Sequence, residues 1–205
     1  DNFASIVAAV REGRTVYDNI KKVISWTLPT NAGEALTIII ALFLGMALPV
    51  TAVQILWVNL ITAITLGLAL AFEPTEKHTM RRPPRPRNAP ILTGELIWHV
   101  VLVSVLFVFA VFGIYAHGID KGYAPELART MAVNTLVVLE VFHLFFVRNI
   151  YGTSLTWDVI KGTPVVWSTV MVVSAAQFAI TYFPPLQTVF GTQAVPFWDG
   201  LLIVA

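Results

Sequence analysis

The sequence predicts an all-α protein: a polytopic bundle of about six membrane-spanning helices, the last one truncated, with a helical stalk at the amino terminus. Two observations carry this prediction. Of the 205 residues, 57% are hydrophobic and only 12% are charged, whereas soluble domains carry about 25% charged residues. The apolar residues also gather in stretches long enough to cross the roughly 30 Å hydrocarbon layer, which takes about 20 residues of helix.

Six apolar stretches define the predicted spans, and Pro- and Gly-rich segments separate them. Five stretches reach or approach the required length, and the sixth is cut short by the chain end. The predicted spans are residues 23–48, 52–72, 96–116, 128–147, 165–183 and 195–205.

The composition excludes several functional classes. With no cysteine in the chain, disulfides, thiol nucleophiles, Cys-ligated zinc and iron–sulfur clusters are all excluded. The formal net charge of +1 gives no electrostatic basis for a nucleic-acid partner. The partner that this composition indicates is the lipid bilayer.

The distribution of basic residues predicts the orientation. Eleven of the 13 Lys and Arg residues lie in the leading segment and in the connections after the second and fourth spans. Because basic residues are enriched on the cytoplasmic side of membrane proteins, the amino terminus and the Pro/Arg-rich connection 73–91 are expected in the cytoplasm. We expect an integral, multi-pass protein of a prokaryotic cell membrane.

The chain divides into a predicted stalk, residues 1–22, and a predicted membrane domain, residues 23–205. Apolar residues of the stalk recur at helical spacing with charged residues between them. Only Gly13 interrupts the pattern before Pro29, which favours one helix that runs from the cytoplasm into the first span. A short helix lying on the membrane surface is the alternative.

Two carboxylates lie deep within the predicted spans. Glu34 is in the first, with Asn31 one turn earlier, and Glu140 is in the fourth, with His143 on the same face. An ionisable residue inside a membrane costs about 2.5–3.5 kcal/mol on insertion scales and is therefore a functional candidate. For Glu140, a protonated acid bonded to His143 or to a backbone carbonyl is the structural alternative.

The first span combines this carboxylate with a weakened helix. Pro29 removes a backbone donor and frees a carbonyl one turn earlier, and Gly33 lowers helix stability further. Asn59 and Thr62 add neutral oxygens from one face of the second span. Carbonyl, carboxylate and amide oxygens are the ligands of hard cations, so this set favours a cation site.

Single polar residues in the spans also have a packing interpretation. An interhelical hydrogen bond in a membrane contributes about 0.6 kcal/mol, and each Asn or Thr taken alone fits that role. The row Ser174, Gln177 and Thr181 on the fifth span is interpreted as helix–helix packing.

The sequence contains ion ligands but no recognisable catalytic machinery. It has no Gly-rich phosphate loop, no nucleophile elbow and no metal-ligand His spacing. The polar clusters Tyr17-Asp18-Asn19 and Glu73-Pro74-Thr75-Glu76 have no catalytic spacing. We therefore expect no catalytic residue and no cofactor site in this chain.

Several segments together resemble the type II P-type ATPases. The matching segments are Asp1–Ile6, Glu12–Arg14, Tyr17–Asn19 and Lys21-Lys22 for the stalk, Pro29–Glu34 for the fifth membrane helix, Gln54–Leu60 for the sixth, Glu73–Arg85 for the loop after it, and Thr130–Glu140 for the eighth helix of the calcium-pump branch. The resemblance is strong over residues 1–92 and weaker afterwards. It implies a chain that runs from the end of the phosphorylation domain through helices five to nine and into ten.

The resemblance also implies a ligand set for the transported cation. The residues that match the family's ion ligands are Asn31, Glu34, Asn59, Thr62 and Glu140. One departure is Ala63, because calcium pumps carry an Asp at this position of the sixth helix. Neither a two-ion stoichiometry nor calcium specificity therefore follows from the resemblance.

The function that the resemblance implies is that of the ion-binding transmembrane portion of an ATP-driven cation pump. Mg²⁺ and ATP would be used by parts outside this chain, and the stretch alone would not be a catalytic ATPase. Its expected partners are the bilayer, the transported cation, and the preceding helices and cytoplasmic domains of the same pump. A stand-alone secondary transporter or channel-like protein and a non-transporting membrane scaffold are the alternatives.

Overall fold

A computed structural model describes residues 2–76, 78–86, 88, 90–148 and 162–205. These residues form helices and no strand, which confirms the predicted all-α class. The elements are α1 (Phe3–Phe43), α2 (Ala52–Thr62), the π-helical turn η1 (Ala63–Gly67), α3 (Leu68–Ala71), the 3-10 turn η2 (Thr79–Arg81), α4 (Gly94–Asp120), α5 (Pro125–Val147), α7 (Pro164–Tyr182), α8 (Pro184–Phe190) and α9 (Phe197–Val204).

Four helical segments of the described chain are long and apolar enough to cross a membrane. They are Ala52–Ala71, Gly94–Asp120, Pro125–Val147 and Pro164–Tyr182. Each coincides with one of the predicted spans, so the predicted membrane bundle is confirmed. The first predicted span begins within α1 but extends past its end, and the last corresponds to the short helix α9.

The carboxyl end of α1 differs from the sequence prediction. The helix ends at Phe43, not at residue 48, because Gly45 adopts a left-handed conformation with φ of 61°. The Gly45 amide donates to the Leu42 carbonyl over 3.2 Å, and the Met46 amide donates to the Ala41 carbonyl over 2.8 Å. This pair of bonds is a Schellman motif, which satisfies the last carbonyls of the helix.

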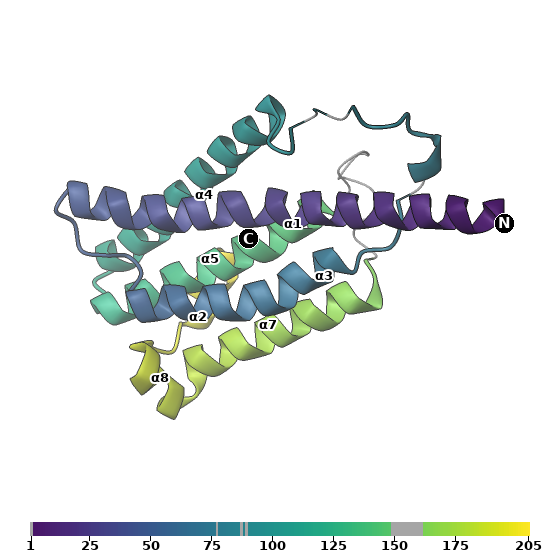
Figure 1. The fold of residues 1–205 in the computed structure, drawn as a ribbon. Helices are drawn as coiled ribbons and strands as arrows, with labels where there is room; N and C mark the ends of the chain where they lie inside the picture. Colours follow the sequence, from purple (N-terminus) through teal and green to yellow (C-terminus); the bar gives the residue numbers. More distant parts are fainter. Residues whose placement is uncertain (1, 77, 87, 89, 149–161) are drawn as a thin grey trace.

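The helix α1 contains both the stalk and the first predicted span without interruption. In Figure 1 its amino-terminal end projects beyond the rest of the bundle, α4 crosses it obliquely, and α2 and α3 run back beside it in the opposite direction. Threonine side chains begin three of the other helices: Thr51, Thr93 and Thr163 each accept a hydrogen bond from the amide three residues later. Such caps satisfy amides that have no partner within the helix.

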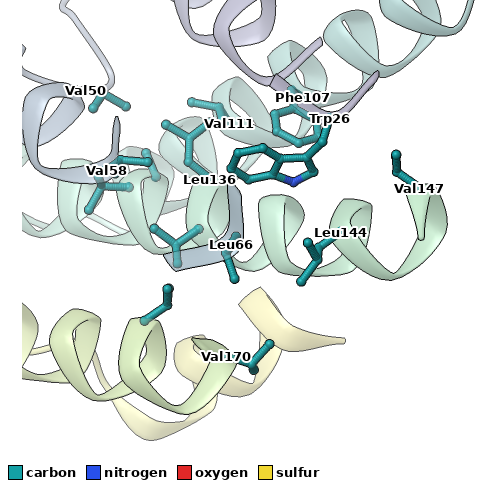
Figure 2. Close-up of a cluster of buried hydrophobic side chains, with 14 of the residues drawn as sticks. Trp26, Val50, Val58, Leu66, Phe107, Val111, Leu136, Leu144, Val147 and Val170 are labelled. Carbon is teal, nitrogen blue, oxygen red and sulfur yellow. The ribbon is translucent and has the colours of Figure 1, made fainter. Parts of the chain in front are cut away.

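Side chains from α1, α2, α4, α5 and α7 meet in one apolar core. Trp26, Leu66, Phe107, Leu136 and Leu144 belong to it, and each is at most 3% exposed. Figure 2 shows the Trp26 indole lying between Phe107 and Leu136. The outward surface of α4 is also apolar, with Phe109 73% exposed, as expected of a helix that contacts lipid.

At the end of α4, a polar cluster joins α9 to the bundle by hydrogen bonds. Asp199 accepts hydrogen bonds from the Lys121 ammonium over 2.6 Å and from the Tyr123 hydroxyl over 2.8 Å. The hydrogen bond to Asp199 raises the pKa of Lys121 above its ordinary value.

Of the basic residues that predict the orientation, Lys77, Arg87 and Lys161 lie outside the described residues.

Candidate cation site

The centre of the candidate site is a contact between α1 and α2. The Asn59 amide Nδ2 donates to Glu34 Oε2 over 2.6 Å and also to the Ile55 carbonyl over 3.1 Å. The Glu34 side chain is 4% exposed. Its second oxygen, Oε1, is buried without a hydrogen-bond donor in the described structure.

A second carboxyl group approaches from α5. Glu140 is 2% exposed, and its side chain lies beside Thr62 and close enough to Glu34 for the two carboxyl groups to interact. Glu140 Oε2 is buried and, like Glu34 Oε1, has no donor among the described residues. Buried polar atoms are nearly always hydrogen-bonded in proteins, so two unpartnered carboxyl oxygens favour a cation or protons at this position.

The helix changes its geometry directly after Thr62. The Thr62 hydroxyl donates to the Val58 carbonyl over 2.8 Å, and the next five residues, Ala63–Gly67, form the π-helical turn η1. Single π turns inside α-helices frequently occur at functional sites. This turn was not predicted from the sequence, because no local residue pattern identifies it.

The close approach of α4 to α1 depends on Gly33, the residue before Glu34. A Cβ atom at this position would lie 2.8 Å from the Phe107 Cβ, a distance at which neighbouring atoms must move. The missing side chain therefore allows α4 to pack directly against the turn of α1 that carries Glu34.

The structure brings together four of the five predicted ligands: Glu34, Asn59, Thr62 and Glu140. Asn31 lies one turn before Glu34 on α1, but its side chain is exposed, and no hydrogen bond among the described residues joins it to the other four. The described residues contain no group of three or more His, Asp or Glu side chains placed to hold a metal ion. A cation here would therefore rely on two carboxyl groups and neutral oxygens.

Because Pro29 has no amide hydrogen, the carbonyl of Ser25, four residues earlier, lacks its usual helical donor. From the sequence, this freed carbonyl was expected to join the cation site, but the structure gives it another partner: His143 Nε2 lies 3.3 Å from the Ser25 oxygen.

The polar row on α7 matches its packing interpretation, since Gln177 donates to Asn134 of α5 over 2.6 Å and accepts from Trp57 of α2 over 3.3 Å.

A buried polar network that the sequence did not predict joins the stalk to the loop after α3. Asn19 donates to the Glu73 carbonyl over 2.7 Å, and Lys22, 1% exposed, forms an ion pair with Glu76 at 2.9 Å. The network therefore unites the two polar clusters in which the sequence showed no catalytic spacing.

The same network continues in both directions along the loop. Farther along it, Arg82 forms an ion pair with Asp18 of the stalk. Toward the bundle, Arg148 at the end of α5 pairs with the Glu73 carboxylate at 2.7 Å. The loop is thus bonded to both α1 and α5, the helices that carry Glu34 and Glu140.

The amino-acid sequence is similar to one protein family and to several curated proteins. The sequence profile of the family described as "Cation transporting ATPase, C-terminus" matches residues 47–205. Among curated proteins, "Probable cation-transporting ATPase F" of Mycobacterium tuberculosis is 44% identical over 100% of this chain. "Cation-transporting ATPase pma1" of Synechocystis is 35% identical over 94% of the chain, and the "Calcium-transporting ATPase" of Bacillus subtilis is 33% identical over 100%.

The chain spans about a quarter of the length of these relatives, with 23%, 22% and 23% covered respectively. The family profile agrees with the resemblance to cation-transporting P-type ATPases that the sequence predicted. The match includes α2 and α5, which carry Asn59, Thr62 and Glu140, and the relatives extend it over α1 and Glu34. The chain therefore belongs to the family of C-terminal membrane domains of cation-transporting ATPases.

Proposed function

We propose that this chain is the ion-binding transmembrane portion of an ATP-driven cation pump. The observation that carries the proposal is the convergence of Glu34 and Glu140, two buried carboxyl groups from α1 and α5, each with one oxygen that lacks a donor among the described residues. Thr62 of α2 adds a hydroxyl oxygen beside Glu140, and Asn59 lies beside Glu34 with its amide nitrogen toward the carboxylate. Oxygen ligands of this kind suit a hard cation.

The transported ion is proposed to be a divalent cation, with calcium favoured. The relative from Bacillus subtilis is named a calcium-transporting ATPase, and the five predicted ligands match the calcium-pump branch, as the resemblance implies. Asn31, exposed in this structure, is proposed to complete the ligand set when the preceding helices of the intact protein cover its face.

The energy for transport is proposed to come from domains outside this chain. Those domains would bind ATP and Mg²⁺ and become phosphorylated, and the stalk, residues 1–22, would transmit their movement to the turn of α1 that carries Glu34. The continuity of α1 from Phe3 to Phe43 and the network that bonds the stalk to the loop support this role. The stalk and loop 73–91 are proposed to face the cytoplasm of a prokaryotic cell.

Phosphorylation of the intact protein tests the proposal. Membranes that contain it are incubated with labelled ATP across a series of calcium concentrations, and the acid-stable phosphoenzyme is measured. A saturable, cation-dependent phosphoenzyme that requires higher calcium in a Glu140→Gln variant is expected. Cation flux without any phosphoenzyme would instead support a secondary transporter.

A further inference from the structure

A helix that contains an internal proline has one carbonyl without its usual donor. In α1 this carbonyl is that of Ser25, because Pro29 has no amide hydrogen to offer it. The helix nevertheless continues through Pro29 without a break. Inside a membrane, a freed carbonyl must find a donor from a neighbouring helix or from water.

The neighbouring donor comes from α5. His143 Nε2 lies 3.3 Å from the Ser25 oxygen, and the His143 side chain is 6% exposed. A carbonyl oxygen only accepts hydrogen bonds, so the contact requires the tautomer or ionisation state of His143 in which Nε2 carries a hydrogen. The imidazole thus replaces the backbone donor that Pro29 lacks.

Aromatic neighbours hold the His143 ring in this orientation. His99 of α4 stacks on it with ring centroids 5.1 Å apart and planes inclined by 24°. Phe107 meets the ring edge-on, with centroids 6.3 Å apart and an interplanar angle of 80°. Phe107 is also the residue against which Gly33 packs, so one aromatic cluster contacts both the imidazole and the turn of Glu34.

A second hydrogen bond joins the same two turns. The Trp26 indole donates to the Glu140 carbonyl over 3.1 Å, and Trp26 and Glu140 lie in the same turns as Ser25 and His143. The two bonds therefore fix one turn of α1 against one turn of α5. Interhelical hydrogen bonds of this kind join membrane helices in addition to their packing, and because both are directional they fix the register of the two turns.

We propose that His143 is a positioning residue. Its imidazole donates the hydrogen bond to the Ser25 carbonyl that the residue at position 29 would donate if it were not proline. By this contact it sets the register of α1 against α5, and hence the position of Glu34 relative to Glu140. This inference rests on the proposed function of the carboxyl pair. It assigns His143 no contact with the cation.

A double-mutant cycle with Pro29 tests the proposal in the intact protein. His143→Leu removes the donor, and Pro29→Ala restores a backbone amide that can bond the Ser25 carbonyl within α1. We expect His143→Leu to lower the thermal midpoint in detergent and to raise the calcium concentration for half-maximal phosphorylation about tenfold, the effect of one lost buried hydrogen bond. Adding Pro29→Ala to His143→Leu should restore most of both losses.

Two further variants separate the hydrogen bond from packing. His143→Gln keeps a donor at a similar reach and should retain near-normal calcium dependence. His99→Leu disturbs the same ring stack, but His99 Nε2 has no hydrogen-bond partner among the described residues. Any loss in His99→Leu should therefore persist when Pro29→Ala is added.

The possible results distinguish this inference from the proposed function. Additive effects of His143→Leu and Pro29→Ala on both readouts, or a His143→Gln variant as impaired as His143→Leu, would overturn the positioning role alone. A wild-type protein with no cation-dependent phosphoenzyme would overturn the proposed function and, with it, the role of His143 at the site.

Discussion

The Asn59 amide on α2 donates to the Glu34 carboxylate on α1 over 2.6 Å, although 25 residues separate them in the sequence. The bond joins two helices at the level where α5 contributes Glu140. Because Asn59 also donates to the Ile55 carbonyl of its own helix, its amide is held from two sides. A carboxylate fixed in this way is preorganised for a ligand.

Replacing Glu34 by Gln should weaken cation activation of phosphorylation in the intact protein. The change keeps the shape of the side chain but removes the negative charge, so we expect a loss of apparent affinity greater than about tenfold, the lower range found for partners that only support metal ligands. The measurement is the calcium concentration for half-maximal phosphoenzyme. Glu126→Gln is the matched control, because this carboxylate is 49% exposed and lies outside the site. Equal calcium dependence in Glu34→Gln and the wild type would remove Glu34 from the site.

Adding a methyl group at Gly33 should destabilise the bundle. The new Cβ would lie 2.8 Å from the Phe107 Cβ, and overpacking of this kind costs about 1–3 kcal/mol. Gly113→Ala is the control within the same helix pair, because a Cβ there has no atom within 4 Å. Thermal midpoints in detergent should fall for Gly33→Ala and stay level or rise for Gly113→Ala. A Gly33→Ala variant as stable as Gly113→Ala would contradict the close packing of α1 and α4.

The ion pair between Lys22 and Glu76 should respond asymmetrically to mutation. Lys22 is 1% exposed and Glu76 is 13% exposed, so Glu76→Gln leaves a buried ammonium without its partner, which costs about 3–5 kcal/mol. Lys22→Met leaves a carboxylate that retains some contact with water, and an apolar chain of similar length fills the space. We therefore expect a large fall in thermal midpoint for Glu76→Gln, a small one for Lys22→Met, and a partial recovery in the double variant. Equally large losses in the two single variants would contradict this asymmetry, and equally small losses would show that water screens the pair.

The spans and the candidate site residues could be identified from the sequence for different reasons. Each span is a local property, because about 20 apolar residues suffice to identify a membrane helix, and Thr51, Thr93 and Thr163 begin three helices by a local capping pattern. Glu34 and Glu140 were identifiable because a carboxylate inside an apolar stretch is rare.

Contacts between distant segments were not predictable in the same way. Asp18 and Arg82 are 64 residues apart, and nothing in either segment specifies the other as its partner. The Ser25 carbonyl was predictable as a freed acceptor from Pro29 alone, but its donor, His143, depends on how α5 packs against α1. The exposure of Asn31 depends likewise on which surfaces the surrounding helices cover.

The orientation of the bundle can be tested with single cysteines, because the chain has none of its own. The basic residues on the stalk and on the loop after α3 predict a cytoplasmic location for that end. A cysteine replacing Asn88 should therefore resist a membrane-impermeant thiol reagent added outside intact cells, and one replacing Met46, which is 45% exposed, should react. Labelling of the Asn88→Cys variant and protection of Met46→Cys would reverse the proposed orientation.

The number of ions bound per cycle depends on Ala63. Calcium prefers six to eight oxygen ligands with several carboxylates among them, and among the described residues only Glu34 and Glu140 bring acids to this site. Ala63, the first residue of the π-helical turn, contributes no oxygen from its side chain where calcium pumps carry an Asp. We therefore predict that the intact protein binds at most one calcium ion for each phosphorylatable site, measured as bound radioactive calcium against maximal phosphoenzyme. A ratio near two would show that a second site forms without an acid at position 63, and no saturable calcium binding would redirect the proposal to sodium, potassium or protons.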